Sequence, residues 1–214
     1  MNLKIKTALV SVSDKENILS LLKILKKYKI KILSSGGTYT AIKKLGYSCT
    51  ELSKYTGFKE MLDGRVKTLH PKIHAGILHD RQNRGHKNEM SSRKFPSIDL
   101  IVVNFYPFQK VVRSSKNSKD IIENIDIGGP TLVRSAAKNF KNVTILTNKK
   151  DYPNLIKELE KNKGKTSLKF RELMSSKAFG LTAYYDAMIA NWFNRKLNIE
   201  FPERKTIFGR KLQK

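Results

Sequence analysis

Residues 7–45, TALVSVSDKENILSLLKILKKYKIKILSSGGTYTAIKKL, contain the pattern that decides the fold. The run Thr7–Val12 is short and apolar, which is typical of a buried strand. Ser13 stands three residues before Glu16, the spacing of a capping box, and this predicts that a helix starts here. Apolar residues then recur at amphipathic spacing from Ile18 to Leu25. We therefore expect a strand followed directly by a helix that ends near residue 28.

A second strand and a glycine-rich loop come next. Residues 30–33 predict the strand, residues 33–38 (LSSGGT) the loop, and residues 39–45 another helix. Strand, helix, strand, loop and helix in this order indicate a parallel sheet. The glycines allow backbone amides to face a ligand, the following helix N-terminus favours an anion, and Ser34, Ser35 and Thr38 add hydroxyl donors. The loop therefore predicts a phosphate site, with an ordinary turn as the alternative.

The rest of the chain extends this pattern. We expect further strands over residues 47–52, 98–103 and 143–146, and a helix over residues 130–140 with a proline at its first position. Residues 53–97 show no regular period and are predicted to be irregular, whereas residues 151–196 predict helices that pack on the sheet. The prediction is one α/β domain over residues 1–200, with a mostly parallel central sheet flanked by helices in three layers, and a basic segment over residues 201–214.

Composition places limits on the class of protein. The chain has 214 residues, 39% of them hydrophobic, which is enough for a sizeable core. No apolar stretch approaches the roughly 18 residues that span a bilayer, and residues 1–6 show no signal-peptide region. Cys49 is the single cysteine and lies in a predicted strand, so we expect a buried structural thiol. These features predict a cytoplasmic protein without a membrane segment.

The formal net charge of +25 has several possible meanings. A strongly basic chain can bind nucleic acid, an anionic membrane surface or phosphorylated metabolites. Lysines greatly outnumber arginines here, whereas base readers and bidentate phosphate clamps depend on arginine. The basic residues are also scattered along the chain. We expect a solvated basic surface and no specific nucleic-acid partner.

Residues 63–71, DGRVKTLHP, place two cations, a hydroxyl and an imidazole in one segment without a regular period. A solvated loop is one interpretation, but loops of this composition beside apolar strands often carry ligand contacts. His70 and His74 are four residues apart, and Pro71 restricts His70 to the edge of any helix that joins them. No pair of carboxylates accompanies the histidines, so we expect no metal site.

Two further clusters follow predicted strands or precede predicted helices. Asn104 and Tyr106 come directly after the strand over residues 98–103, and ligands of open α/β sheets bind beyond the carboxyl ends of strands. Residues 124–130, NIDIGGP, lead into the helix that carries Arg134 and Lys138 on one face. Each cluster has a structural interpretation by itself, but four clusters in one small domain favour a site.

Together these motifs resemble one known family. The segments SVSDK (11–15), SGGT (35–38), GFKEMLDGRVKTLHPKIH (57–74), NFYPF (104–108) and DIGGPTLVRSAAK (126–138) occur in this order. They resemble the IMP cyclohydrolase domain of the bifunctional purine-biosynthesis protein, whose other half is AICAR transformylase. The resemblance covers roughly residues 5–200 and implies a methylglyoxal-synthase-like (MGS-like) fold.

The resemblance implies the last step of IMP synthesis. The substrate would be 5-formamidoimidazole-4-carboxamide ribotide (FAICAR), which closes its six-membered ring and loses water. An amide nitrogen is a weak nucleophile and a formamide carbonyl a weak electrophile. An enzyme would therefore fix the reactive rotamer, supply protons and stabilise the developing oxyanion. The family implies no metal and no cofactor, and it implies a homodimer.

The resemblance also implies roles for individual residues. Lys138 matches the proton donor and acceptor, and Lys67 is the candidate for polarising the formyl group. Tyr106 and Asp126 would orient the amide and relay protons. The other expected residues bind substrate, with the phosphate held by residues 13–15 and 35–38 and the base by residues 104–105; they are Ser11, Ser13, Asp14, Lys15, Ser35, Gly36, Gly37, Thr38, Arg65, Val66, Thr68, Asn104, Phe105, Ile127, Gly128 and Gly129.

Alternative functions remain open from the sequence. An MGS-like lyase shares the fold and a glycine-rich phosphate loop, and a non-catalytic module of this fold would bind a nucleotide without turnover. Nucleic-acid binding through the net charge is the third alternative. Residues 201–214 lie where the junction to a transformylase domain would fall, so this domain is a possible partner. We expect no transformylase activity from the chain alone, whether it is a separate domain or a free-standing cyclohydrolase.

Overall fold

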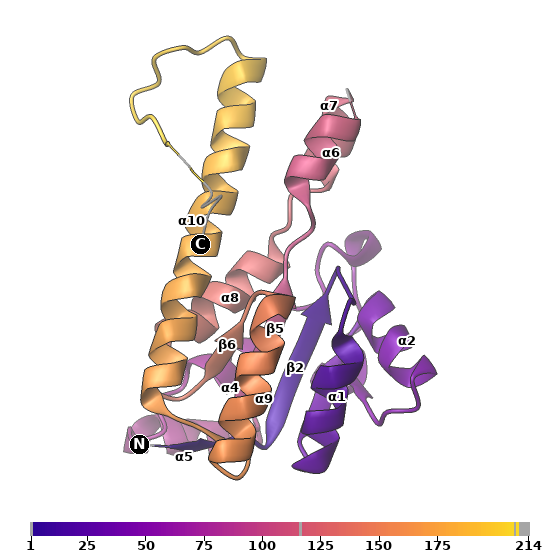
Figure 1. The fold of residues 1–214 in the computed structure, drawn as a ribbon, viewed down its shortest axis with the longest axis vertical. Helices are drawn as coiled ribbons and strands as arrows, with labels where there is room; N and C mark the ends of the chain where they lie inside the picture. Colours follow the sequence, from indigo (N-terminus) through magenta and orange to yellow (C-terminus); the bar gives the residue numbers. More distant parts are fainter. Residues whose placement is uncertain (1, 116, 208, 210–214) are drawn as a thin grey trace.

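A five-stranded parallel sheet forms the centre of the molecule (Figure 1). The computed structural model describes residues 2–115, 117–207 and 209. The strand order is β4-β3-β2-β5-β6, which confirms the predicted α/β class and parallel sheet. The strands of this sheet are β2 (Thr7–Val12), β3 (Lys31–Ser34), β4 (Thr50–Glu51), β5 (Leu100–Asn104) and β6 (Thr144–Leu146).

The central strand β2 lies between β3 and β5. From β2 the chain adds β3 and β4 on one side of the sheet and then returns to add β5 and β6 on the other side. Leu9 pairs with Leu33 on one side and with Ile101 on the other, so the apolar runs are in register. Side chains on both faces of β2 and β5 are buried, as expected for a parallel sheet covered by helices. The carboxyl ends of β2 and β5 therefore form a topological switch point, where α/β proteins bind ligands.

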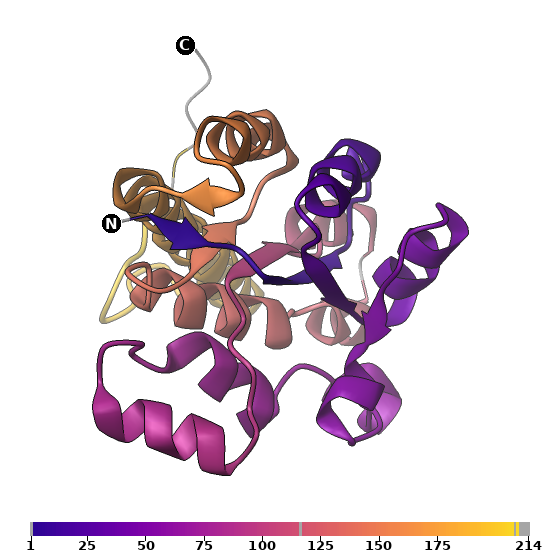
Figure 2. The same cartoon turned by 90° about the horizontal axis from the view of Figure 1, so that it is seen from below.

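Helices cover both faces of the sheet and give three layers (Figure 2). Helices α1 (Ile18–Lys27) and α9 (Tyr152–Lys161) cover one face, and α4 (Pro71–Leu78) and α8 (Gly128–Lys138) cover the other. The remaining elements are α2 (Gly36–Lys44), α3 (Leu52–Thr56), α5 (Arg84–Ser92), α6 (Phe108–Ser114), α7 (Ser118–Glu123), α10 (Leu168–Lys196) and the 3-10 turns Leu62–Gly64 and Lys149–Asp151.

Helix α10 joins two hydrophobic cores. It has 29 residues, a length of about 43 Å at 1.5 Å per residue. Its first half packs on α8 and β6 and contributes Met174 and Ala178 to the main core. Its second half extends beyond the sheet (Figure 1) and forms a smaller core, in which Tyr185 and Trp192 pack with Phe108 and Ile121. The second core supports the segment that follows β5.

The predicted capping box at Ser13 is wrong. Helix α1 begins at Ile18, after Asn17 in a left-handed conformation (φ 61°), and no side chain caps it. The Ser13 hydroxyl lies 2.8 Å from Asn104 Oδ1 and 2.9 Å from the carbonyl oxygen of Phe105. A partner distant in the sequence therefore takes the hydroxyl that would otherwise have capped the helix.

Two helices start earlier than predicted, and one strand is shorter. Helix α2 begins at Gly36 and α8 at Gly128, so each glycine pair belongs to a first helical turn and not to a preceding loop. The strand expected over residues 47–52 consists of Thr50–Glu51 alone, at the sheet edge. Cys49 is half-buried and precedes that strand, and burial raises the pKa of its thiol to about 11.

The prediction of an irregular segment over residues 53–97 is also wrong. This segment contains α3, α4 and α5. His70 is the N-cap of α4 and its Nδ1 accepts from the Lys72 amide at 3.1 Å, with Pro71 at the first helical position. Asn83 caps α5 in the same way. Helices α3 and α5 each bury a single residue and α4 has only eight residues, so none of them leaves a long apolar period in the sequence.

The termini add a small feature that the sequence did not predict. Leu3–Lys4 (β1) pairs antiparallel with Lys165–Thr166 (β7) in a separate two-stranded sheet. Within residues 201–207 and at residue 209 the structure has no helix or strand, and the rest of the expected 201–214 segment lies outside the described residues. None of the helices described is both long and apolar enough to cross a membrane.

Candidate functional site

Most of the predicted site residues come together at the carboxyl edge of the sheet. Residues 13–15 follow β2, residues 35–38 follow β3, and residues 104–106 follow β5. Residues 126–129 open α8, and the loop over residues 57–70 crosses between α3 and α4. The motifs are far apart in the sequence, but the parallel topology brings their ends to one edge.

Asn104 fastens the segment after β2 to the segment after β5. Its Oδ1 accepts from the amides of Ser13 at 2.7 Å and Asp14 at 3.1 Å, and its Nδ2 donates to the Asp14 carbonyl at 2.9 Å. These bonds cross the switch point between the two strands. Asn104 therefore sets the shape of the loop that carries Lys15.

The expected phosphate loop is the first turn of α2. Ser35 is the N-cap residue, and its hydroxyl makes no capping bond. The hydroxyls of Ser34 and Thr38 bond instead to β2, to the carbonyls of Val10 at 2.7 Å and Val12 at 2.9 Å. Ser35 and the amides of the first helical turn are therefore the groups of this loop that can face an anion.

Two lysine ammonium groups face the glycines of this turn. Lys67 Nζ lies 3.5 Å from where a Cβ on Gly36 would be, and Lys15 Nζ lies 3.9 Å from the same position on Gly37. Gly36 also has a positive φ of 52°, which a larger residue would adopt only with strain. Two cations at a helix N-terminus create an environment that favours a phosphate.

The loop over residues 57–70 turns sharply before Lys67. Leu62, Asp63 and Gly64 are consecutive left-handed residues (φ 54°, 53° and 88°), and the turn pairs Met61 with Val66 in an isolated bridge. Left-handed backbone costs a non-glycine residue roughly 1–2 kcal/mol. The chain therefore maintains a strained turn directly before the predicted catalytic lysine.

Two cations of this loop, Arg65 and Lys67, have different partners. Lys67 Nζ lies 3.2 Å from a carboxylate oxygen of Glu60, inside the loop. Arg65 forms an ion pair with Glu123 of α7 at the exposed surface, and its Nε lies 3.0 Å from that carboxylate. Lys67 therefore faces the phosphate turn, whereas Arg65 connects the loop to α7.

Asp126 lies at the start of α8 and is half-buried. Its Oδ1 accepts from the Gly129 amide at 2.8 Å, and its own amide donates to the Tyr185 hydroxyl at 2.8 Å. Burial raises the pKa of Asp126, while the amides of Gly129 and Tyr106 oppose that rise. Burial likewise raises the pKa of Tyr185 to about 12. Among the described residues, the hydrogen bonds that oppose the rise at Asp126 come from backbone amides.

Glycine is required at both positions that begin α8. A Cβ on Gly128 would lie 2.6 Å from the Thr68 hydroxyl oxygen, and a Cβ on Gly129 would overlap the carboxylate of Asp126. Thr68 is itself buried. The two glycines therefore let the loop over residues 57–70 and Asp126 approach the same helix end.

His74 connects the same loop to α8 from behind. Its Nδ1 lies 3.2 Å from the Ser135 hydroxyl, and burial lowers its pKa while the Thr68 backbone acts in the opposite direction. His74 therefore connects α4 to α8.

Lys138 lies at the opposite end of α8 from the other site residues. Ten residues separate it from Gly128, a distance of about 15 Å along the helix at 1.5 Å per residue. Its neighbour Asn139 donates to the carbonyls of Ile77 at 2.7 Å and His79 at 3.0 Å. No hydrogen bond or ion pair between described residues joins Lys138 to the carboxyl edge, so its role stays a prediction from the resemblance.

The remaining expected residues lie on the rim or in the wall of the site. Tyr106 is 56% exposed and Ile127 is 59% exposed. The Phe105 ring packs on the Tyr185 ring, with 4.9 Å between the ring centroids. Ser11 is half-buried in β2, and Val66 belongs to the isolated bridge with Met61. Aromatic and apolar surface thus borders the polar groups.

Sequence reasoning missed three residues that shape the site: Glu60, Lys149 and Tyr185. Lys149 binds Asp14 at 2.7 Å and also forms an ion pair with Glu16, and the hydrogen bond from Lys149 lowers the pKa of Asp14. It follows β6, so the rule about carboxyl ends of strands could have identified it. Glu60 stands within a quoted motif, but nothing in the sequence distinguished Tyr185 from other core residues.

The described part of the chain contains no cluster of three or more histidine, cysteine, aspartate or glutamate residues that could hold a metal ion. The groups at the carboxyl edge are ammonium ions, amides, hydroxyls, the exposed carboxylates of Asp14, Glu16 and Glu60, and the half-buried carboxylate of Asp126. They can bind an anion, donate hydrogen bonds to a developing negative charge and transfer protons.

Comparisons with known proteins agree with this arrangement. The MGS-like domain model matches residues 17–131, just over half of the chain, and the AICARFT/IMPCHase bienzyme model matches residues 136–214. The crystal structure of ForH superimposes with a TM-score of 0.79 at 31% identity, covering 88% of this chain and 97% of ForH.

Curated relatives include bifunctional purine biosynthesis proteins PurH. The protein from Bradyrhizobium diazoefficiens is 45% identical over 210 residues, 98% of this chain and 40% of that protein. The protein from Leptospira biflexa is 47% identical over 213 residues, 99% of this chain and 42% of that protein. The chain therefore spans about two fifths of the length of these relatives. With its parallel sheet and the motifs at its carboxyl edge, the chain belongs to the MGS-like domain family and is homologous to the bifunctional PurH proteins.

Proposed function

We propose that this chain is an IMP cyclohydrolase, which closes the ring of FAICAR to form IMP and water. The observation that carries the proposal is the convergence of two lysine ammonium groups on the Gly36-Gly37 turn, beside Asn104 and Asp126. A ribotide phosphate fits the first turn of α2, and its base then lies toward the ends of β2 and β5. The homology with purine biosynthesis proteins supports a nucleotide of this pathway as the ligand.

In this reaction the carboxamide nitrogen bonds to the formyl carbon. The carboxamide nitrogen and the formamide nitrogen each lose one proton as the new C–N single bond and the C=N double bond form, and these two protons balance those that the formyl oxygen gains before it leaves as water. A hydrogen-bond donor near the formyl oxygen would stabilise the negative charge that develops there. Asp126, with a raised pKa, is our proposed acceptor or relay for a proton, and the exposed Tyr106 beside it would orient the amide.

Lys67 and Lys138 have less direct assignments. We assign Lys67 to the formyl oxygen, and this role requires its ammonium to leave Glu60 and the Gly36 turn. The competing assignment for Lys67 is contact with the phosphate, because its ammonium lies at the Gly36 turn in the structure. Lys138 would act as proton donor and acceptor only if the ligand site extends along α8 to its far end.

The test is a direct assay of the chain with FAICAR, in which ultraviolet absorbance follows IMP formation. Lys15→Ala is expected to raise KM with little effect on kcat, because it removes phosphate binding. Lys67→Ala lowers kcat if the lysine polarises the formyl group and raises KM if it holds the phosphate. Lys138→Ala at the parental rate would remove Lys138 from the mechanism.

Two controls separate this function from its rivals. Dihydroxyacetone phosphate with an assay for methylglyoxal tests the MGS-like lyase. Tight binding of IMP without turnover of FAICAR would indicate a non-catalytic module. Absence of IMP formation, under conditions where a bifunctional PurH protein is active, would contradict the proposal.

The assembly is also part of the proposal. We infer a cytoplasmic homodimer that works with a transformylase domain, since the relatives are bifunctional and longer than this chain. Analytical ultracentrifugation of the chain tests the dimer. Addition of a separate transformylase domain with its substrates tests whether FAICAR passes between the two activities.

A further inference from the structure

A second cavity lies at the opposite end of the sheet from the candidate site. It has a volume of about 710 Å³, within the range of roughly 300–1,000 Å³ that small-molecule sites show. Its walls are β1 with the residues leading into β2, the turn between α1 and β3, and the segment before β5. These walls stand at the amino ends of the strands, whereas the candidate site lies at their carboxyl ends.

The wall of this cavity is strongly basic. Five of its residues are cationic, and they come from three separate segments: Lys4, Lys6, Lys29, Lys31 and Arg81. The only carboxylate in the wall is that of Asp99. Among the described residues, none of the four lysines forms an ion pair with a carboxylate.

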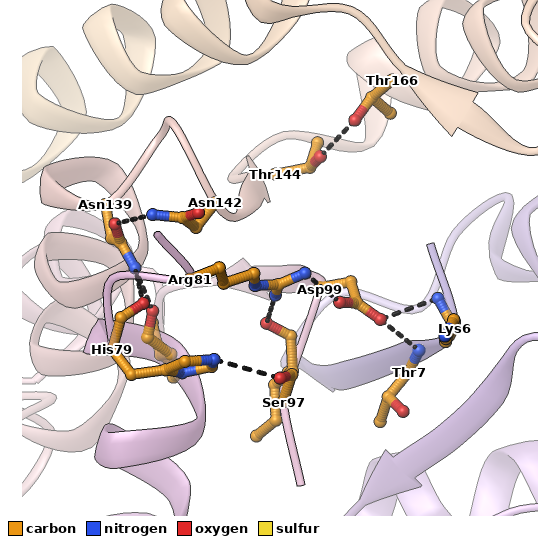
Figure 3. Close-up of polar contacts among 12 residues, drawn as sticks. Lys6, Thr7, His79, Arg81, Ser97, Asp99, Asn139, Asn142, Thr144 and Thr166 are labelled. Carbon is orange, nitrogen blue, oxygen red and sulfur yellow. Dashed lines mark hydrogen bonds and ion pairs between the residues drawn. The ribbon is translucent and has the colours of Figure 1, made fainter. Parts of the chain in front are cut away.

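The charge of Asp99 is already compensated. Its side chain is 3% exposed, and Arg81 Nη1 lies 2.7 Å from one of its oxygens (Figure 3). Its other oxygen accepts from the amides of Lys6 at 2.7 Å and Thr7 at 2.8 Å. The carboxylate therefore fixes the cavity wall and leaves the lysine charges without a counterion from the protein.

The lysines differ in their freedom to reach a ligand. Lys4 donates to the Lys163 carbonyl at 3.3 Å and lies over the Tyr28 ring, so its ammonium is held in place. Lys6 and Lys31 are neighbours, because the Lys31 amide donates to the Lys6 carbonyl at 2.8 Å. Their ammonium groups, with that of Lys29, are the ones that can close on an anion.

We propose that this cavity binds a small organic phosphate, with the phosphate group between Lys6, Lys29 and Lys31 and the organic part on Leu3 and Pro96. A phosphate dianion supplies the counterion that the wall lacks. The apolar side chains at the rim then cover the non-ionic part of the same molecule. The proposal does not depend on the reaction assigned to the carboxyl edge.

The experiment uses phenyl phosphate as the probe, with inorganic phosphate for comparison, in titration calorimetry at constant ionic strength. Three double variants each remove two positive charges. Lys6→Gln with Lys31→Gln alters the cavity, Lys15→Gln with Lys67→Gln alters the candidate site, and Lys23→Gln with Lys169→Gln alters exposed positions in neither. The amide signals of Thr7 and Asp99 in NMR spectra locate binding at the cavity.

The expected result is binding in the parent chain that shifts the Thr7 and Asp99 signals. The cavity variant then weakens this binding by about tenfold or more, because two charged contacts are lost. The candidate-site variant and the exposed control leave these shifts in place. Equal weakening in the cavity variant and the exposed control would mean a general charge effect and would overturn the proposal, as would the absence of shifts at Thr7 and Asp99.

Discussion

Each edge of the sheet holds a carboxylate that is shielded from solvent, Asp99 fully and Asp126 in part, and the two have different partners. Asp99 at the amino edge binds the Arg81 guanidinium and two backbone amides. Asp126 at the carboxyl edge binds backbone amides, and burial raises its pKa. A cation compensates the first carboxylate, and backbone amides bind the second.

We therefore assign a structural role to the charge of Asp99 and a functional role to that of Asp126. A buried ion pair with satisfied hydrogen bonds holds chain segments in place, and losing one partner leaves the other uncompensated. A carboxylate with a raised pKa costs stability when ionised, but it is better suited to exchange protons.

Left-handed backbone and close glycine contacts occur at the carboxyl edge, around residues 62–64 and 128–129. They also occur at the amino edge, where Lys29 has a φ of 54° and a Cβ on Gly164 would lie 2.8 Å from the Tyr28 ring. The two edges therefore differ in how their carboxylates are compensated and not in backbone strain.

The largest expected effect is on stability at the amino edge. Asp99→Ala removes the partner of the half-buried Arg81 and leaves two amides without an acceptor, so we expect a loss of about 3 kcal/mol in the free energy of unfolding. Urea denaturation measures it. Asp14→Ala is the control, because its ion pair with Lys149 is exposed at the other edge. An equal loss of unfolding free energy in Asp99→Ala and Asp14→Ala would contradict the stronger structural role that we assign to the carboxylate of the amino edge.

The second effect concerns geometry at the carboxyl edge. Gly129→Ala would bring a Cβ against the Asp126 carboxylate, and we expect kcat/KM for ring closure to fall by about a hundredfold, as small misplacements of reacting groups do. Gly180→Ala in α10 is the matched control, since nothing lies within 4 Å of its Cβ position. The control should keep full activity. Unchanged kinetics in Gly129→Ala would show that the Asp126 contact does not position the site.

The smallest effect concerns the charge of Asp126. A raised pKa means that the folded state disfavours the ionised carboxylate of Asp126 relative to the unfolded chain. Asp126→Asn should therefore raise Tm slightly at pH 7 while it lowers ring closure. As the pH falls through the raised pKa toward the ordinary value of 3.8, the parent protonates and its stability approaches that of the variant. Melting curves from pH 3 to pH 8 measure the effect. A higher Tm for the parent than for Asp126→Asn at pH 7 would contradict the prediction that the ionised Asp126 carboxylate costs stability.

The fold was largely predictable because its signals are local. Apolar runs predicted β2, β5 and β6, and amphipathic spacing predicted α1. The predictions were wrong where the local structure depends on contacts with residues distant in the sequence or where a helix leaves little apolar pattern. The Ser13 hydroxyl bonds to Asn104 rather than to a helix start, and the short helices of residues 53–97 leave no long apolar period.

The candidate site divides in the same way. Its motifs and the rule about strand ends predicted most of its residues, and Lys149 follows the same rule. The pairing of Lys67 with Glu60, the contact of Tyr185 with Asp126 and the distance of Lys138 along α8 could not be read from spacing. Each of these depends on how separate segments pack.

By itself the sequence determined the order of the five central strands and of α1, α2 and α8, the positions of the glycine pairs and the identity of the charged groups, because hydrophobic period and backbone freedom act over a few residues. The tertiary structure decided which of those charges meet. It directed Lys15 and Lys67 to one turn, bound Asp126 to a backbone amide, paired Asp99 with Arg81, and collected lysines around a cavity at the amino edge. Electrostatic interaction depends on distance and burial, and folding sets both.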